Sequence, residues 1–256
     1  MDVRGAVALV TGASRGVGRA IALALADAGA DVACAARATD VSPLKLPGTI
    51  DETVRSIEQR GQRGLPIPTD LSKSDQVEAM VARTISTFGR LDVLVNNAAI
   101  TFPGDLELPI KRWDLVMDVN LRAPLLAMKA AMPGMIARRC GAILNVSSAA
   151  ALMPIPGLLV YGVSKAGLER LTTGAAEELR VHGVAVNCLR IDLPLASEGF
   201  VCNAPELDKS DWQPTEVGAT AALWMLGQPA VFTGQVKGLS ELRGEPRPAA
   251  PGRAAR

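Results

Sequence analysis

The strongest constraint on the fold is a glycine-containing turn between two apolar segments near the start of the chain. Residues 6–10 (AVALV) form the first apolar run, the turn covers 11–18 (TGASRGVG), and an Ala- and Leu-rich helical pattern follows at 19–28. Gly29 ends that helix, and residues 31–36 form a second apolar run. A strand, a turn, a helix and a strand within about thirty residues make a βαβ unit, whose two strands are parallel. The sequence therefore predicts an α/β fold with a mostly or wholly parallel sheet.

The rest of the chain continues this alternation of strands and helices. We expect further strands at residues 65–68, 91–95, 142–147, 184–189 and 235–239. We expect helices at residues 51–60, 74–88, 115–137, 161–181 and 215–225, the third of them kinked or started late by Pro124 and Pro133. Residues 37–50 and 192–214 are expected to be irregular. No linker divides the chain, so we predict one domain at residues 1–243 and a disordered tail, rich in Pro, Ala and Arg, at 244–256.

Composition and charge exclude several kinds of function. A formal net charge of +1 and a pI near 7.7 argue against nucleic acid or an acidic membrane surface as the main partner. The four cysteines show no metal-ligand spacing and the chain has one histidine, so we expect no metal site. The longest apolar window, residues 21–36, is too short to span a bilayer and is interrupted by Asp27 and Asp31. We therefore expect a cytoplasmic protein with no signal peptide and no membrane segment.

Three glycines, Gly12, Gly16 and Gly18, make the first turn a candidate phosphate-binding site. Glycine allows backbone N–H groups and the N-terminus of the following helix to approach a pyrophosphate closely. The spacing differs from the GxGxxG pattern of the common dinucleotide-binding turn. By itself the turn is compatible with two interpretations, a phosphate site or only a tight connection between a strand and a helix.

A second candidate site lies between residues 145 and 165. Tyr161 and Lys165 are four residues apart, so on a helix the phenol and the ammonium point the same way. A free tyrosine has a pKa near ~10, and a cation a few ångströms away lowers it toward the range useful for acid–base chemistry. Ser148 comes where the strand at 142–147 ends and is placed to hydrogen-bond the same substrate oxygen. A Tyr–Lys pair at this spacing alone is also an ordinary pattern of packing and solvation.

Taken in order, these motifs resemble the short-chain dehydrogenase/reductase family over residues 5–233. The resemblance rests on residues 11–18, Asp70-Leu71, residues 96–99 (NNAA), Asn120, Ser148 and residues 161–165 (YGVSK). Residues 47–50 (PGTI) resemble the hydroxysteroid-dehydrogenase-like branch of the family. The family implies a single-domain, Rossmann-like three-layer sandwich with a seven-stranded sheet, NAD(P) as cofactor, a small-molecule substrate, and a homodimer or homotetramer.

The resemblance also implies a role for each residue that matches a family motif. Tyr161 would be the acid or base on the substrate oxygen, Lys165 would lower its pKa and bind the nicotinamide ribose, and Ser148 would polarise the substrate. Asn120 would hold a water that links Lys165 to solvent. The cofactor would be bound by the turn residues Gly12, Ser14, Arg15, Gly16, Val17 and Gly18, by Asp70 and Leu71 near the adenine, and by Asn97 and Ala98.

The end of the second strand bears on the choice between NAD(H) and NADP(H). NAD-dependent enzymes usually carry an acidic residue there, which bonds the ribose 2′-hydroxyl. Here the position is Ala36, followed by Arg37, and Arg15 lies in the glycine turn. Two guanidinium groups near the ribose would suit a 2′-phosphate, so we predict NADP(H) over NAD(H). The alternative is that both arginines are solvated loop residues.

The segment after the sixth strand departs from the family pattern. Ile191 and Asp192 stand where the family usually has Pro-Gly, and Ser197 stands near the usual Thr, so the contacts to the nicotinamide are left open. Apolar residues dominate 149–159 and 193–212, which favours a hydrophobic substrate. We predict an oxidoreductase that transfers a hydride between NADP(H) and a carbonyl or hydroxyl. A non-catalytic NAD(P)-binding sensor or scaffold, and a dehydratase or epimerase on the same fold, are the alternatives.

Overall fold

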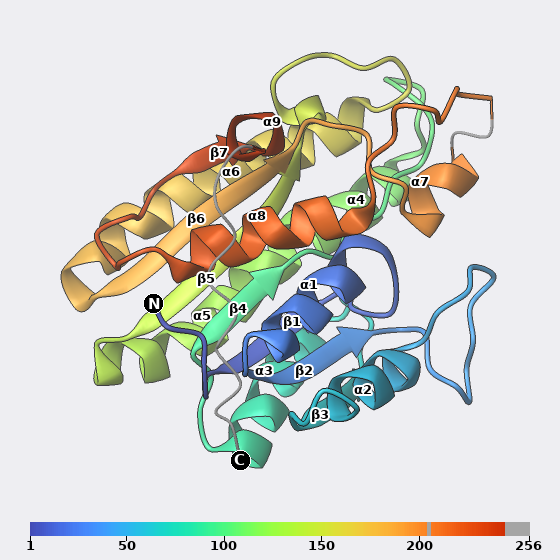
Figure 1. Cartoon of the computed structure of the whole chain (residues 1–256). Coiled ribbons are helices and arrows are strands. Elements are labelled where there is room, and N and C mark those ends of the chain that lie inside the picture. The colour runs from blue at the N-terminus through green and yellow to red at the C-terminus, as the bar shows by residue number, and fades with distance from the viewer. Residues whose placement is uncertain (204–205, 244–256) are drawn as a thin grey trace.

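The sheet of the protein has seven strands and is wholly parallel. The computed structural model describes residues 1–203 and 206–243, so the tail predicted at 244–256 lies outside the described residues. The strands are β1 (Val7–Thr11), β2 (Asp31–Ala36), β3 (Gly64–Pro68), β4 (Val93–Asn96), β5 (Gly141–Ser148), β6 (Val184–Ile191) and β7 (Val236–Gly238). They lie in the order β3-β2-β1-β4-β5-β6-β7, and all neighbours are parallel (Figure 1). The predicted α/β fold with a parallel sheet is therefore confirmed.

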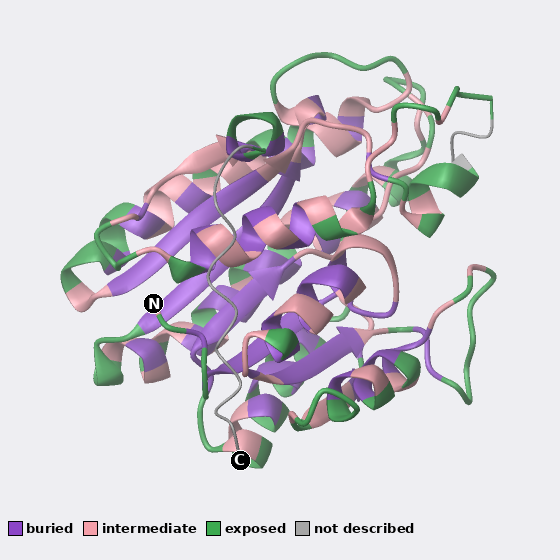
Figure 2. Ribbon diagram, viewed as in Figure 1, coloured by how far each residue is buried: buried purple, intermediate pink, exposed green. Residues whose placement is uncertain are grey.

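Helices cover both faces of the sheet and complete a three-layer sandwich (Figure 1). One face carries α1 (Gly16–Asp27), α2 (Ile50–Glu58), α8 (Thr215–Gly227) and α9 (Leu239–Leu242). The other face carries α3 (Ser74–Phe88), α5 (Ala123–Arg138) and α6 (Leu159–Leu179). α4 (Ile110–Met117) precedes α5, and the short α7 (Glu198–Asn203) follows β6. The central strands are buried on both faces, as Figure 2 shows, which accounts for their continuous apolar sequences.

Small side chains allow α1 and α8 to pack closely on one face of the sheet. Their buried positions are mostly Gly and Ala, namely Gly18, Ala20, Ala22 and Ala26 in α1 and Gly218, Ala219, Ala221 and Ala222 in α8. A Cβ added at Gly218 would lie 3.0 Å from Leu195 Cδ1 and 3.5 Å from Val17 Cγ1. The side chains of Val17 and Leu195 therefore belong to this core. Because the interior has few aromatic side chains to fill it, the backbones of the helices lie close together.

The helices differ from the predicted ones mainly in four places. α1 begins at Gly16, inside the predicted turn, because positive φ angles at Gly12 and Gly16 turn the chain into the helix earlier than the apolar pattern indicates. The helix predicted at 115–137 is α4, a π-helical turn at Asp118–Arg122, and α5. α7 lies in a segment predicted to be irregular, and α9 follows β7 where the sequence predicts the end of a strand. Both helices are shorter than the two turns that make a periodic pattern recognisable.

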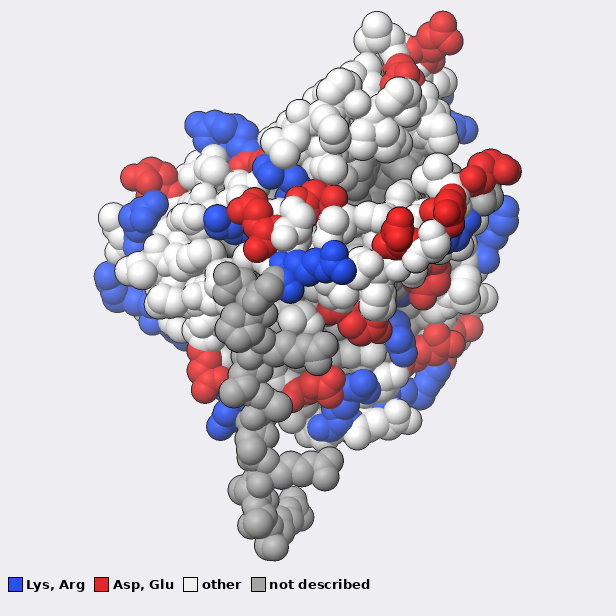
Figure 3. Space-filling model, turned by 45° about the horizontal axis from the view of Figure 1, so that its top comes forward, with Lys and Arg blue, Asp and Glu red and all other residues white. Residues whose placement is uncertain are grey.

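The surface carries both signs of charge. Acidic and basic side chains are interspersed over the face of the molecule shown in Figure 3, as expected for a chain whose net charge is near zero. Within residues 1–203 and 206–243, no helix is long and apolar enough to cross a membrane. The same residues contain no cluster of His, Cys, Asp and Glu side chains suited to a metal ion.

Gly18 provides a test of the contact between α1 and the end of β4. A Cβ at this position would collide with the side-chain amide of Asn97 and the carbonyl oxygen of Gly12. Gly18→Ala is therefore expected to lower the free energy of unfolding by about 1–3 kcal/mol through overpacking, although alanine is the better helix former. Chemical denaturation measures the change.

Gly227→Ala is the matched control at the end of α8, where an added Cβ meets no atom within 4 Å. This variant is expected to be neutral or more stable by up to about 1 kcal/mol. Equal stability of the two variants would contradict the close approach of α1 to β4.

Candidate active site

The predicted site residues converge because parallel strands place their carboxyl ends at one edge of the sheet. Thr11 ends β1 and Asn96 ends β4, the two strands between which the order of the sheet reverses. Ser148 ends β5 and pairs with Ile191 at the end of β6. Loops that leave these four strand ends therefore share one edge, where open α/β sheets usually bind their ligands.

The glycine turn after β1 has the geometry of an anion site. Gly12 and Gly16 have φ angles of 68° and 56°, which side-chain-bearing residues rarely adopt. A Cβ at Gly12 would lie 2.9 Å from the Cα of Ala98. α1 starts at Gly16 with no side-chain cap and no acidic residue in its first turn, while Ser14 beside it is buried. The N-terminus of α1 thus meets the backbone requirements of a dinucleotide pyrophosphate.

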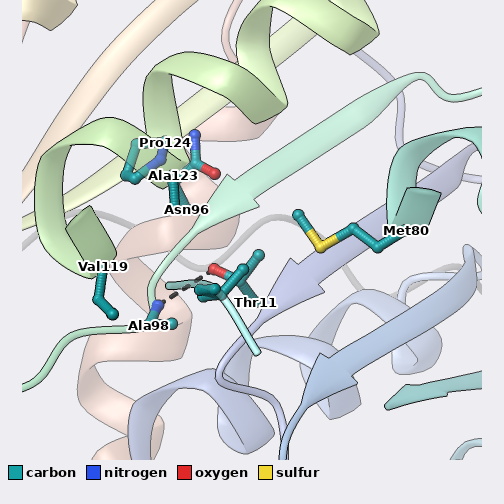
Figure 4. Close-up of a pocket in the computed structure, with 8 residues that line it drawn as sticks. Thr11, Met80, Asn96, Ala98, Val119, Ala123 and Pro124 are labelled. Atoms are coloured by element: carbon teal, nitrogen blue, oxygen red, sulfur yellow. Dashed lines mark hydrogen bonds between the residues drawn. The ribbon is translucent and has the colours of Figure 1, made fainter. Parts of the chain in front are cut away.

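Thr11 and Asn97 fasten the end of β1 to the end of β4. The Thr11 hydroxyl accepts hydrogen bonds from the backbone N–H of Asn97 at 3.0 Å and of Ala98 at 3.1 Å, the second drawn in Figure 4. The Asn97 side chain donates to the Thr11 carbonyl at 2.9 Å. Leu71, after β3, lines the same crevice as Thr11, Met80 and Ala98. These contacts fix the separation of the glycine turn from the loop that follows β4.

Arg15 is engaged differently from the prediction. Its guanidinium donates to the carbonyls of Leu46, Pro47 and Gly48 at 2.7–3.0 Å and so holds the loop between β2 and α2 against the glycine turn. Within the described residues only its Nη1 nitrogen has no such bond. In this structure Arg15 therefore chiefly holds the loop in place. The prediction that Arg15 and Arg37 both contact a ribose phosphate stays a prediction, and Nη1 is the Arg15 donor that would be available for it.

Arg37 is exposed and has no hydrogen bond or ion pair to the rest of the described chain. Its charge acts on Arg15, whose pKa is lowered by burial and then by Arg37 against the opposing charge of Glu198. It also acts on Asp70. Burial opposes the ionised form of Asp70, but hydrogen bonds from Ser72, with Arg37 and Lys73, lower its pKa below the usual value. Arg37 therefore lies beside the glycine turn and near Asp70 with its donors available.

Ser148, Tyr161 and Lys165 come together at the ends of β5 and β6. Ser148 lies near enough to Tyr161 for its hydroxyl to lower the pKa of the phenol, and Lys165 Nζ lies 5.6 Å from the centre of the Tyr161 ring. Lys165 Nζ donates to the carbonyl of Val146 at 2.7 Å, and only 2% of the lysine is exposed. Ser147, on the opposite side of the strand, is buried, and its hydroxyl has no partner within the described chain.

The acid–base properties of this cluster differ in one respect from the prediction. Burial raises the pKa of Tyr161, against a smaller lowering by the hydrogen bond with Ser148. The net result is a pKa above the ordinary value for tyrosine, whereas the sequence predicted one below it. Burial also lowers the pKa of Lys165 to about 8, because a desolvated ammonium is disfavoured. Tyr161 consequently keeps its proton at neutral pH, and Lys165 is close to losing its own.

Asn120 lies in the π-helical turn at Asp118–Arg122. Its side chain accepts from the N–H of Ile100 at 2.8 Å, and donates to the Ile100 carbonyl at 2.9 Å and to the Ser164 hydroxyl at 3.1 Å. The Ser164 hydroxyl donates in turn to the backbone carbonyl of Tyr161 at 2.7 Å. The Asn120 amide therefore links the loop after β4 to the first turns of α6. Through Ser164 it supports the position of Tyr161.

The unusual residues after β6 have structural partners. Ile191 completes β6 and packs in the core, and the Asp192 carboxylate accepts from the N–H and hydroxyl of Ser240 at 2.8 and 2.6 Å. Further on, the chain returns to the glycine turn. A Cβ at Gly16 would lie 3.1 Å from Ser197 Cβ and 3.6 Å from Glu198 Oε2. Because like charges repel, an anion bound at this turn would displace the exposed Glu198 side chain.

Apolar side chains are exposed in the segments that follow β5 and β6. Leu152, Met153 and Ile155 are exposed in the loop after β5. Phe200 stacks on Trp212, with ring centres 4.4 Å apart and planes inclined by 11°. Gly157 N–H donates to the Asp105 carboxylate, and Gly104 N–H donates to the Gly157 carbonyl, so the loops after β4 and β5 are joined.

Sequence analysis did not identify an ion pair beside Lys165. Glu169 follows Lys165 by four residues on α6 and accepts two hydrogen bonds from Arg190 in β6. The spacing from Tyr161 to Lys165 to Glu169 is a visible signal in the sequence, since all three lie on one helical face. The pairing of Glu169 with Arg190 on β6 has no such signal, because Arg190 is distant from Glu169 in the chain.

Comparison with known proteins agrees with the geometry of the site. The profile of a family described as short chain dehydrogenase matches residues 6–192. Hydroxysteroid dehydrogenase-like protein 2 of Danio rerio is 37% identical over 235 residues, covering 90% of this chain and 56% of that protein. The 3-oxoacyl-(acyl-carrier-protein) reductase FabG of Staphylococcus aureus is 40% identical over 183 residues, covering 71% of this chain and 72% of that protein. The chain thus spans little more than half the length of the first of these relatives.

Solved structures share the whole fold. A putative dehydrogenase from Xanthomonas campestris superposes with a TM-score of 0.85 at 36% identity, covering 94% of this chain and 90% of that one. A metagenomic short-chain oxidoreductase in complex with NADP gives a TM-score of 0.77 at 33% identity, covering 93% and 97% of the two chains. With the family profile matching most of the chain, we conclude that this protein belongs to the short-chain dehydrogenase/reductase family of oxidoreductases.

Proposed function

We propose that the chain transfers a hydride between NADP(H) and a carbonyl or hydroxyl group of a hydrophobic small molecule. The observation that carries this proposal is the Ser148–Tyr161–Lys165 cluster, which lies at the same sheet edge as an uncapped, glycine-lined helix start. A bound nicotinamide would supply or accept the hydride at that edge. The chain itself contributes proton transfer, orientation and exclusion of water.

Tyr161 is the proton donor in this proposal. Because its pKa is raised by burial, the phenol is protonated at neutral pH and is suited to protonate the oxygen of a carbonyl as it is reduced. Ser148, whose hydroxyl lies near the phenol, orients that oxygen. The Lys165 ammonium beside the ring stabilises the phenolate left after proton transfer. At neutral pH the protonated phenol is the form needed for the reduction step, whereas oxidation would need the phenolate.

The substrate is proposed to be a hydrophobic ketone or aldehyde. Exposed Leu152 and Met153 and the stacked pair of Phe200 and Trp212 give the approach an apolar wall. Apolar walls with a few fixed polar groups are typical of small-molecule sites. A homodimer or homotetramer stays part of the proposal, supported by partly exposed apolar residues on α5 and α6, Leu125 and Val163.

Removal of the Tyr161 hydroxyl tests the reaction. Tyr161→Phe is expected to reduce turnover by at least about 100-fold, since general acid catalysis is worth 10²–10⁴-fold, while NADPH affinity stays nearly unchanged. NADPH consumption over a panel of aliphatic, aromatic and steroid ketones and aldehydes measures turnover. Tryptophan-to-NADPH energy transfer measures binding.

Adjacent serines supply a matched control for this test. Ser148→Ala is expected to lose most of the turnover, whereas Ser147→Ala is expected to keep it, because the Ser147 hydroxyl has no partner among the described residues. Activity of Tyr161→Phe within tenfold of wild type would rule out the assigned mechanism. NADPH binding without turnover on any carbonyl in the panel would favour the sensor or the dehydratase alternative.

NADP(H) is proposed as the cofactor on the basis of Arg37. The end of β2 carries Ala36 in place of an acidic residue, and the Arg37 guanidinium is exposed with unused donors beside the glycine turn. Guanidinium and phosphate form strong bidentate hydrogen bonds. The NADP bound to the metagenomic neighbour supports the same choice.

Arg37→Asp is expected to weaken NADPH binding at least about tenfold while NADH binding changes little, because the carboxylate repels a 2′-phosphate but accepts from a 2′-hydroxyl. Titration with each nucleotide gives the two dissociation constants. Arg83→Asp makes the same charge change on the exposed face of α3 and should weaken neither. Equal losses for NADPH and NADH in Arg37→Asp would argue against a 2′-phosphate contact.

A further inference from the structure

Lys165 is a buried cation that is sensitive to its surroundings. Among the described residues, its ammonium donates one hydrogen bond, to the carbonyl of Val146. Only 2% of the residue is exposed. Burial lowers its pKa to about 8, near the pH at which the protein would work. A modest change in nearby charge therefore decides whether Lys165 carries its proton.

The groups that face Lys165 differ in whether they are charged. They are Tyr161 and Glu169 from α6, Cys188 from β6, and the uncharged Val146 carbonyl from β5, while Arg190 of β6 is bonded to Glu169. Burial raises the pKa of Tyr161 and raises that of Cys188 to about 12, so both stay protonated and neutral. Glu169 is consequently the anion that stabilises the ammonium at neutral pH.

Glu169 is held in a fixed position by Arg190. Arg190 Nε donates to Glu169 Oε1 at 2.8 Å and Nη2 donates to Oε2 at 2.7 Å, a two-pronged arrangement with both side chains 13% exposed. The other ion pairs of the described residues have at least one partner more exposed than this. Shielding such a pair from water is costly, and replacement by apolar residues is often neutral or stabilising. Stability alone therefore does not explain its presence beside Lys165.

We propose that Glu169 and Arg190 form a positioning pair that sets the charge of Lys165 and thereby the upper pH limit of the reaction. Glu169 lies one helical turn beyond Lys165 on the same face of α6, so its negative charge stabilises the ammonium. Arg190 anchors that carboxylate to the sheet and partly offsets its charge. The catalytic consequence rests on the proposed function, whereas the coupling to Lys165 does not.

Two variants that shift the deprotonation of Lys165 in opposite directions distinguish this role from a merely structural one. Loss of the Glu169 charge leaves Arg190 uncompensated, so Lys165 should lose its proton at lower pH. Loss of the Arg190 charge leaves Glu169 uncompensated, so Lys165 should keep its proton to higher pH. Asp192, whose charge also acts on Arg190, is fixed by Ser240 and is unchanged in both variants. A pair that only held β6 to α6 would give two variants altered alike.

The test compares Glu169→Gln and Arg190→Met with wild type in protein carrying ¹³C at lysine Cε. Titration of the Lys165 signal, identified by its absence in Lys165→Met, gives the pH of proton loss without need of turnover. We expect Glu169→Gln to lower this pH by at least about half a unit and Arg190→Met to raise it by a similar amount. The alkaline limb of kcat/KM for NADPH-dependent reduction should shift the same way, since activity falls as pH rises through the deprotonation of Lys165.

Two controls accompany the pair. Glu177→Gln removes a carboxylate from an exposed ion pair farther along α6 and should shift nothing. Arg190→Lys keeps the positive charge, so Lys165 should titrate in this variant as it does in wild type. This control can be measured even if Arg190→Met does not fold. Shifts of the same sign, or none, in Glu169→Gln and Arg190→Met would overturn the proposal. Shifts of Lys165 as expected without turnover in wild type would leave the coupling intact and refute the proposed reaction.

Discussion

The contact between the ends of β1 and β4 determines where the other parts of the site can lie. The order of the sheet reverses between these strands, so their carboxyl ends open a crevice that no crossing helix covers. The Thr11 hydroxyl and the Asn97 side-chain amide form hydrogen bonds across this crevice. Gly12 lies so close to Ala98 that its Cα can carry only hydrogen and no Cβ. The glycine turn, the uncapped start of α1 and the loop after β4 are thus held at fixed separations by a few short polar contacts.

A chain of buried amides extends this arrangement to the acid–base residues. The Asn96 side chain donates to Asn145 at 2.9 Å, and Asn145 donates to Thr172 of α6 at 2.9 Å. Each member is buried, so breaking one bond would leave a desolvated polar group unpaired. β4, β5 and α6 are therefore held in one register. This register brings Tyr161, near the start of α6, to Ser148 at the end of β5.

Local pattern predicts much of this protein because its central strands are buried on both faces and helices such as α2 and α3 are amphipathic. β2 and α3 begin and end at the predicted residues, and the resemblance places Tyr161, Lys165 and Ser148 in what proves to be one cluster. Features fixed by distant contacts are not predictable in this way. The engagement of Arg15 by the 46–48 carbonyls, the raised pKa of Tyr161 and the partner of Glu169 all depend on segments far apart in sequence.

The segment after β6 connects the glycine turn with the stacked pair of Phe200 and Trp212. Ser197 and Glu198 lie over Gly16, and two residues later Phe200 stacks on Trp212 at the apolar wall. A ligand at the glycine turn and a ligand at the apolar residues would therefore both meet this one short segment. The two sites are adjacent along the chain as well as at the sheet edge.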